Sequence, residues 1–308
     1  MSKDKFYFPL MWKSEVEMKN LKDFGKALRK IRKDKGLTLA KLGKKEISTS
    51  TLSAFERGEK EIRISNFYLL IRRLRISFQE FWYIVNDYDL SDFEKTWKEI
   101  TDLYNEGKLN DLKHLLLVLE QKKDSGSTYE ELEYLMLKNL IGSKDQGFGI
   151  NSDEKEMIVD YLKKNKSWTA YELFVYANVL NSFDVEVIKT LSDDLLKRTS
   201  LYRSIPQNRI TVTRILLSTM AQMLKADDFE SATRYQNEVK PLLDDLDMYE
   251  KTIFHFLDGA INFSRGKKSA GKEAMQEAIG IFRTLKISGL ADSYQKSYDD
   301  FVRISEDL

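Results

Sequence analysis

Residues 37–58, which read LTLAKLGKKEISTSTLSAFERG, constrain the fold of this chain more than any other segment. Their pattern predicts a short helix that starts at Thr38, a turn over residues 44–47, and a second helix that opens on Ser48 and closes on Gly58. Two short helices joined by a tight turn, the second rich in short polar side chains, form a helix-turn-helix. Because this unit presents a helix to the major groove, we predict that the chain binds DNA.

Composition limits the remaining possibilities. Only 3 Pro and 14 Gly interrupt 308 residues, which favours long helices over strands. The length suggests about two domains, and the absence of cysteine excludes disulfides and thiolate metal sites. No apolar run approaches the roughly 18 residues of a membrane span, and the N-terminus lacks the apolar core of a signal peptide. We therefore expect a soluble cytoplasmic protein.

Charge is distributed unevenly along the chain. Residues 1–87 hold 20 Lys and Arg against 11 Asp and Glu, a net charge of +9, whereas residues 88–308 hold 30 against 38, a net charge of −8. The basic part coincides with the helix-turn-helix. This coincidence favours contact between the first domain and a polyanion over a chance excess of basic residues.

We expect an all-α chain in four parts: an N-terminal extension over residues 1–20, a five-helix, phage-repressor-like helix-turn-helix domain over residues 21–86, a polar linker over residues 87–92 and a helical repeat domain over residues 93–308. Within the extension, Met1 and Met18 both remain open as the translation start. Ends of this kind are usually loose, although the aromatic residues of this one suit packing on the domain.

Amphipathic periodicity predicts each helix. In the first domain, the helices beside the motif are expected over residues 21–34, around Phe67 to Leu74, and over residues 78–85. In the second domain, the expected helices span residues 93–104, 109–121, 129–141, 154–164, 168–180, 185–202, 207–225, 229–246, 249–264, 270–285 and 290–304. The residues that mark helix starts are Ser91, Ser152, Ser167 and Asp227 as N-caps and Pro206 in a first turn. Pro241 either kinks its helix or divides it.

Antiparallel helices of this length, joined by short loops, stack into a right-handed solenoid with a concave inner face. Tetratricopeptide repeats have a period of about 34 residues, whereas the spacing here is irregular, so we predict a tetratricopeptide-like array. Four small residues are placed to permit close contact between helices: Ala232, Gly259, Ala274 and Ala278.

The exposed start of the second helix of the motif is the candidate for base reading. Thr49, Ser50 and Ser53 point outward there, together with Ala54, and hydroxyl groups can contact any base edge. No Arg, Asn or Gln lies on that face, so DNA shape and phosphate contacts must supply much of the selectivity. The full set of candidate DNA-binding residues is Arg29, Arg32, Lys33, Thr38, Ser48, Thr49, Ser50, Ser53 and Arg57.

Several of these candidates have a second interpretation. Ser48 is favoured as a simple N-cap. Arg57 either forms an internal pair with a nearby carboxylate or contacts phosphate. Three of the cations of the first helix, Arg29, Arg32 and Lys33, either contact phosphate or form a solvated basic face.

The chain resembles the Rgg family of Gram-positive transcriptional regulators over roughly residues 18–304. The segments that carry the resemblance are 25–32 (GKALRKIR), 53–59 (SAFERGE), 168–173 (WTAYEL), 249–252 (YEKT) with Phe256 and Gly259, and 278–282 (AIGIF). The resemblance implies a cytoplasmic homodimer that takes part in quorum sensing. Its repeat domain is expected to bind a short, hydrophobic, secreted and re-imported signalling peptide, a peptide pheromone. RNA polymerase remains open as a further partner.

Three departures from the family are visible. Leu39 stands where a phosphate-contacting Gln is usual, and Ser218 stands where relatives often carry Asn. The chain has no cysteine, so it cannot form the disulfide that joins the DNA-binding domains of some relatives.

Peptide capture needs a groove with apolar pockets and with amides or charges for an extended backbone. Asn178 lies in an otherwise apolar helix, and polar stripes follow two further helices. The candidates are Asn178, Arg209, Thr211, Arg214, Tyr249, His255, Asp258 and Asn262. For any one of them, hydrogen bonding between helices is the favoured alternative, whereas the set as a whole favours a binding face.

Enzyme functions find little support in the sequence. The only histidines, His114 and His255, are far apart, and Gly147-Phe148-Gly149 lacks the rest of a dinucleotide fingerprint. The acidic residues 244, 245 and 247 suit a solvated helix end better than a metal site, so no cofactor or metal is expected. We expect a peptide-controlled, sequence-specific transcriptional regulator. The alternatives are a peptide-independent regulator whose solenoid docks a protein partner and, less favoured, a phosphatase-like solenoid.

Overall fold

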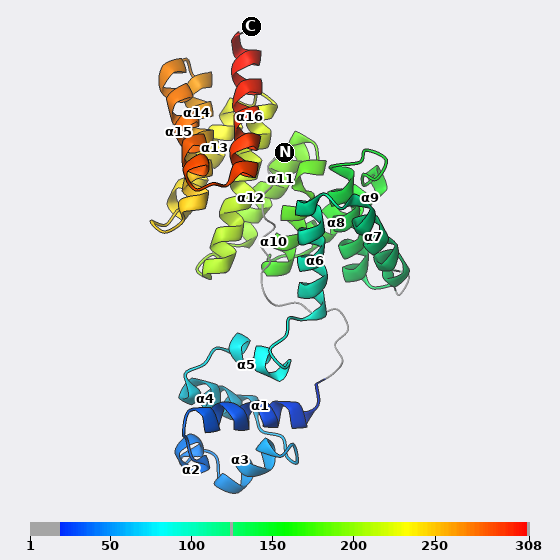
Figure 1. Cartoon of the computed structure of the whole chain (residues 1–308), viewed down its shortest axis with the longest axis vertical. Coiled ribbons are helices and arrows are strands. Elements are labelled where there is room, and N and C mark those ends of the chain that lie inside the picture. The colour runs from blue at the N-terminus through cyan, green and yellow to red at the C-terminus, as the bar shows by residue number, and fades with distance from the viewer. Residues whose placement is uncertain (1–18, 124–125, 307–308) are drawn as a thin grey trace. The chain divides into compact units, whose positions relative to one another are not determined.

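A computed structural model describes residues 19–123 and 126–306, and over these ranges the chain is built from helices without a strand (Figure 1). The expected all-α fold is confirmed. The chain divides into two compact units, with the boundary between Glu99 and Ile100, inside α6 (Asp92–Glu106). The predicted extension, residues 1–20, lies almost wholly outside the described residues. No described helix combines the length and the apolar character that a membrane span requires.

The first unit contains the predicted helix-turn-helix. Its helices are α1 (Leu21–Asp34), α2 (Leu39–Gly43), α3 (Thr49–Glu56), α4 (Ile64–Leu74) and α5 (Phe78–Val85). Thr38 and Ser48 cap α2 and α3, as each side chain accepts a hydrogen bond from a main-chain N–H of the first turn. Leu28, Leu42, Leu52, Leu70 and Phe81 are fully buried between these helices. The apolar spacing of five short segments therefore converges on one small core.

Gly25 lets α1 and α3 meet through their backbones. A Cβ atom at this position would lie 2.2 Å from the carbonyl oxygen of Phe55, which no side chain can tolerate. Gly58 follows α3 with a φ of 75°, in the left-handed region that favours glycine, and so ends the helix. These two glycines fix where α3 lies and where it stops.

The second unit is a stack of helix pairs. Its helices are α7 (Leu109–Lys123), α8 (Thr128–Gly142), α9 (Ser152–Lys164), α10 (Ala170–Val179), α11 (Val185–Arg198), α12 (Pro206–Lys225), α13 (Phe229–Val239), α14 (Met248–Ser264), α15 (Lys268–Thr284) and α16 (Ser288–Glu306), with 3₁₀ turns η1 (Leu180–Ser182) and η2 (Lys240–Leu242). Helices α8, α10, α12 and α14 are successive neighbours in one layer. In the other layer α11 packs against α9 and α12, and α13 packs against α12 and α14. This two-layer order is the expected tetratricopeptide-like solenoid (Figure 1).

Several helix ends differ from the prediction. The N-caps are Asn151, Thr169 and Asp228, rather than the neighbouring Ser152, Ser167 and Asp227. Asn151 and Thr169 are the caps because the main-chain N–H of each donates to the carboxylate of a glutamate three residues later. The helix expected to continue to residue 246 stops at Val239, because Pro241 redirects the chain into η2.

Two internal features hold the repeats together. Gly259 of α14 and Gly271 of α15 face one another, so closely that a Cβ on Gly271 would lie 2.6 Å from the Gly259 carbonyl oxygen. The predicted close contact at Gly259 is therefore confirmed. Farther along the stack, the fully buried hydroxyls of Tyr176, Ser192 and Thr219 form a chain, with oxygen–oxygen distances of 2.9 and 2.8 Å. This chain links α10, α11 and α12.

Candidate functional sites

The first turns of α3 present short hydroxyl side chains to solvent. Thr49 and Ser50 are exposed and Ser53 is half-buried, whereas Leu52 and Phe55 point into the core. The Ser48 hydroxyl accepts from the main-chain N–H of Thr51 at 3.1 Å, which supports its interpretation as an N-cap. Only the outward face of α3 is therefore available for reading bases.

Arg32 corrects one prediction. Its side chain is buried, with only 8% of the residue exposed, and its Nε and Nη2 atoms lie 2.6 and 2.7 Å from the two carboxylate oxygens of Glu56. Nη1 also donates to the carbonyl oxygen of Leu37. A guanidinium held in this way inside the domain cannot reach a phosphate, so Arg32 joins α1 to α3 instead. Its position four residues after the buried Leu28 was the sequence signal for this role.

The other two phosphate candidates of α1 lie at the surface. Arg29 and Lys33 are exposed, and neither forms an ion pair within the described residues. The structure adds further exposed cations that sequence reasoning missed. They lie in the turns on either side of α3: Lys44, Lys45, Lys60 and Arg63. A count of basic residues in these turns, rather than on helices alone, would have found them.

Arg57 follows α3 and is fully engaged with its neighbours. Its Nε and Nη2 atoms lie 2.7 and 2.6 Å from the two carboxylate oxygens of Glu59. Its Nη1 atom donates to the Ser53 hydroxyl at 2.6 Å. This arrangement matches the internal-pair interpretation of Arg57, and it connects that pair to a residue of the reading face.

In the repeat unit, a row of amide side chains crosses α8, α10 and α12, three successive helices of one layer. Asn139 of α8 donates from Nδ2 to the main-chain oxygen of Asn178 on α10 at 2.9 Å. Asn178 donates from Nδ2 to Phe174, and Gln222 of α12 donates to Oδ1 of Asn181 at 2.5 Å. Only Asn178 was predicted. The other three are missed because no sequence spacing shows that these helices are neighbours.

The predicted residues of α12 are tied to the start of α14. Arg209 pairs with the buried Asp247 and also donates to the Leu242 carbonyl oxygen, so it closes the loop after η2. Arg214 lies 2.7 Å from Glu250, and its guanidinium lies 5.1 Å from the centre of the Tyr249 ring. Thr211 is buried and bonds back to the carbonyl oxygen of Gln207 in its own helix. The structure thus brings Arg214 and Tyr249 together, whereas Thr211 faces the interior.

The predicted stripe on α14 makes contacts to two different helices. His255 Nε2 lies 2.8 Å from a carboxylate oxygen of Glu277 on α15. Asp258 accepts from Gln236 on α13 and from Asn262 in its own helix. The hydrogen-bond alternative therefore describes Asp258 and Asn262 well. His255, in contrast, lies near a shallow apolar hollow that Glu277 lines with Met248, Ile281 and Leu285.

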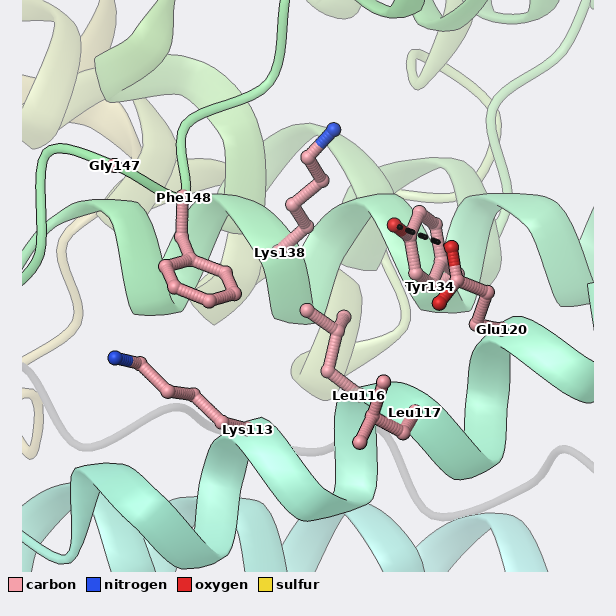
Figure 2. A pocket seen from close by; sticks show the side chains of 8 residues that line it. All are labelled: Lys113, Leu116, Leu117, Glu120, Tyr134, Lys138, Gly147 and Phe148. Carbon is pink, nitrogen blue, oxygen red and sulfur yellow. Dashed lines mark hydrogen bonds between the residues drawn. The ribbon is translucent and has the colours of Figure 1, made fainter.

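A second hollow, of about 320 Å³, lies between α7, α8 and the loop after α8 (Figure 2). Lys113 reaches Asp145 at 2.7 Å and lies 4.5 Å from the centre of the Phe148 ring, while Tyr134 and Lys138 line the other side. No predicted groove residue lines it. Its volume is at the low end for small-ligand sites and too small for an extended peptide.

Glu133 has the most perturbed acidity of the described carboxyl groups. It lies on α8 with 7% of its surface exposed and makes no hydrogen bond within the described residues. Burial raises the pKa of this carboxyl to about 7, Glu130 adds to the rise, and Lys122 opposes it. Burial likewise raises the pKa of the neighbouring Tyr171. No other carboxyl group supports Glu133 as a metal site, since no metal-binding cluster occurs within the described ranges.

Comparisons with known proteins relate both units to one family. The model of the HTH-type transcriptional regulator Rgg, C-terminal domain, matches residues 113–296, more than half of the chain, and a helix-turn-helix model matches residues 28–81. Among solved structures, a cysteine-to-serine variant of the SHP pheromone receptor Rgg2 of Streptococcus dysgalactiae is 25% identical, with a TM-score of 0.78, and the match covers 90% of this chain and 99% of that one.

Two further structures share the fold at lower identity. A putative transcriptional regulator from Listeria monocytogenes EGD-e is 22% identical with a TM-score of 0.79, and the match covers 92% of this chain and 98% of that one. The PrgX/cCF10 complex is 16% identical with a TM-score of 0.70, over 91% of this chain and 92% of that one. Both likenesses concern the architecture of the whole chain.

Proposed function

Because this chain belongs to the Rgg family of helix-turn-helix transcriptional regulators, we propose that a short intercellular signalling peptide controls its binding to DNA. Rgg2 is described as a pheromone receptor, and PrgX has been solved with the peptide cCF10. No catalytic step is part of this proposal. Neither is a protein docked on the solenoid, which remains the rival explanation of the repeat unit.

The reading face of α3 supports the DNA-binding half of the proposal. Thr49, Ser50 and Ser53 are its base-contact candidates, and Arg29 and Lys33 on α1 are its phosphate candidates. Hydroxyls alone discriminate weakly between bases, whereas each neutralised phosphate adds affinity for any sequence. We therefore expect a regulator with modest direct readout, in which the shape of the DNA contributes to selectivity.

The amide row carries the peptide half of the proposal. Asn139 and Asn178 each use Nδ2 to donate to a main-chain carbonyl oxygen, and this fixes the orientation of both amide groups. Their Oδ1 atoms accept no hydrogen bond within the described residues. An extended peptide presents N–H donors along its length, so two such acceptors on adjacent helices suit its backbone. Apolar side chains of the peptide would supply the remaining affinity.

The ionic residues at the other end of the layer are proposed as a second part of the same site. Arg214 and Tyr249 lie together, and His255 contacts Glu277, which lines an apolar hollow. Arg209, Thr211, Asp258 and Asn262 are proposed as supporting residues, since their contacts hold α12, α13 and α14 in place. We further propose a cytoplasmic homodimer, with RNA polymerase as a partner in activation.

The peptide acts only through its unequal affinity for the conformations of the receptor. A peptide that binds two arrangements equally well shifts nothing, whatever its affinity. The same coupling requires that operator DNA changes the affinity for peptide by the factor with which the peptide changes the affinity for DNA. The mechanism is tested by measuring, on the full chain, how much the peptide changes the affinity for DNA and how much DNA changes the affinity for the peptide. The two factors should be equal.

The first experiment is a thermal melt of the full chain with short peptides fractionated from the culture fluid of the source cell. A peptide at about 100 times its dissociation constant stabilises the fold by about 2.7 kcal/mol. We expect one fraction to raise the melting temperature of the wild type and to have little effect on Asn178→Ala. No rise in any fraction, with DNA binding intact, would favour the protein-docking regulator.

A further inference from the structure

Three residues at the end of α3 form a small polar relay. The Arg57 guanidinium forms a bidentate pair with the Glu59 carboxylate, through two N–H···O bonds of 2.7 and 2.6 Å. From its other terminal nitrogen it donates to the Ser53 hydroxyl on the reading face. The bidentate pair lowers the pKa of Glu59, chiefly through the hydrogen bonds from Arg57. The pair is therefore ionised on both sides at neutral pH, and its net charge is zero.

The pair is exposed, which distinguishes it from the buried pair in the same unit. The side chains of Arg57 and Glu59 are 49% and 56% exposed, so water and nucleic acid can both reach them. Exposed ion pairs are individually weak. The role of the Arg57–Glu59 pair therefore depends on its geometry and not on its stability. Arg57 adjoins the reading face of α3, and its guanidinium points toward a carboxylate of its own chain.

The relay also sets the polarity of Ser53. A guanidinium can only donate, so the Ser53 oxygen accepts and its own hydrogen must point elsewhere. The bond from Arg57 occupies one of the two lone pairs of the Ser53 oxygen and leaves its hydrogen free, which favours donation to purine N7, guanine O6 or thymine O4 over acceptance from an amino group. The bond from Arg57 thus reduces the number of base edges that the Ser53 hydroxyl contacts favourably.

We propose that Glu59 tunes the selectivity of this regulator by withholding Arg57 from DNA phosphate and using it to orient the Ser53 hydroxyl. The inference rests on the proposed reading of DNA by α3. It assigns Arg57 and Glu59 as positioning residues, and it makes Glu59 a brake on affinity for DNA of any sequence. A regulator without the Glu59 carboxylate is expected to bind DNA of any sequence more tightly and to discriminate less between sequences.

The substitution Glu59→Gln tests this assignment, because it keeps the shape of the side chain and removes the charge that holds Arg57. Two probes are needed: a duplex enriched from a random-sequence pool by the wild-type full chain, and a scrambled duplex of the same length and composition. One new phosphate contact makes the slope of log affinity against log salt steeper by about 0.9. We expect that change for Glu59→Gln, a gain of several-fold on the scrambled duplex and a smaller gain on the enriched one.

Glu61→Gln is the matched control. Glu61 is an exposed carboxylate two residues away and forms no ion pair within the described residues. It carries the same charge change without releasing an arginine, so both duplexes should gain equally and the salt slope should stay at the wild-type value. If the two variants share one slope and one ratio of affinities, the assignment of Glu59 is wrong.

Arg57→Lys separates the two halves of the relay. It keeps the positive charge but loses the planar fork, so we expect weaker discrimination at one base pair of the enriched duplex in a scan of single base changes. Unchanged discrimination at every base pair would refute the role in orienting Ser53. Failure of the wild type to enrich any duplex would instead overturn DNA reading itself, so the two failures are distinguishable.

Discussion

The two units use polar side chains in opposite ways. In the helix-turn-helix unit, the Arg32–Glu56 pair joins α1 to α3 and Arg73 joins α4 to α2 through the Leu42 carbonyl oxygen, whereas the hydroxyls on the outward face of α3 and the lysines of the turns beside it remain at the surface. In the repeat unit, polar groups bridge successive helices: Arg214 to Glu250 and Tyr176 to Ser192 are examples. A reading surface needs groups free to meet a partner, whereas a stack of repeats needs groups that fix the angle between neighbours. The same residue types therefore indicate a site in one unit and a joint in the other.

Removing half of the buried pair should give the largest loss of stability. Arg32→Ala leaves the Glu56 carboxylate buried without its counter-charge, and we expect a loss of about 3–5 kcal/mol in urea unfolding followed by circular dichroism. Arg234→Ala in the repeat unit should cost much less, because the side chains of Arg234 and its partner Asp193 are 48% and 35% exposed and water can solvate the carboxylate that remains. The double change Arg32→Met with Glu56→Leu should recover most of the loss. Equal losses at Arg32 and Arg234 would contradict the contrast between the buried and the exposed ion pair.

Glu133 gives the repeat unit a dependence on pH opposite in sign to that of shifted carboxyl groups in the first unit such as Glu46, Glu59 and Glu80, whose pKa values are lowered. Its folded pKa of about 7 exceeds its ordinary value of 4.5, so the folded state binds the proton more tightly than the unfolded state. Stability is therefore greatest below pH 4.5 for this group and falls as the pH rises through 7, by up to about 3 kcal/mol. Glu133→Gln should remove this decline. The measurement is the free energy of unfolding at pH 5 and pH 8, between which most of the decline occurs, with Glu131→Gln, an exposed neighbour, as the control.

Each unit contains a glycine at which two helices meet through their backbones. Substituting these glycines tests whether both contacts contribute to stability. Gly25→Ala and Gly271→Ala each place a methyl group against backbone, at 2.2 and 2.6 Å, and we expect each to cost about 1–3 kcal/mol in thermal melts. Gly280→Ala is the control, because nothing lies within 4 Å of the added carbon and the position is helical. That variant should be more stable than the wild type by about 0.5–1 kcal/mol.

Hydroxyl groups provide the smallest and most direct test of the contrast. Tyr176→Phe removes one end of the buried chain and leaves the Ser192 hydroxyl and the Ile188 carbonyl oxygen with one partner fewer, at a cost of about 1–2 kcal/mol. Ser50→Ala, on the exposed face of α3, should change stability by under about 0.5 kcal/mol while weakening DNA binding. Chemical denaturation measures the first effect and gel-shift titration the second. A stability loss at Ser50 that matches the one at Tyr176 would contradict the exposed reading face.

The sequence predicted the fold far better than it predicted the contacts of individual side chains. Apolar spacing places Leu28, Leu52 and Leu70 in the core, because each helix shows its buried face in its own periodicity. The amide row was largely missed because Asn139 and Gln222 stand on helices that become neighbours only once the repeats stack. Arg32 was misassigned for a related reason: charge alone suggests solvent, whereas its counter-charge lies 24 residues away.

The reciprocal contact between Gly259 and Gly271 has a mechanical consequence. Side chains between two helices act as springs, because they change rotamer and absorb small displacements. Where backbone touches backbone no such adjustment is possible, so α14 and α15 have little room to shift against one another at this point. The pair therefore behaves as a single stiff post near the end of the stack. We therefore expect a displacement of α14 to move α15 and, with it, α16, which packs against α15.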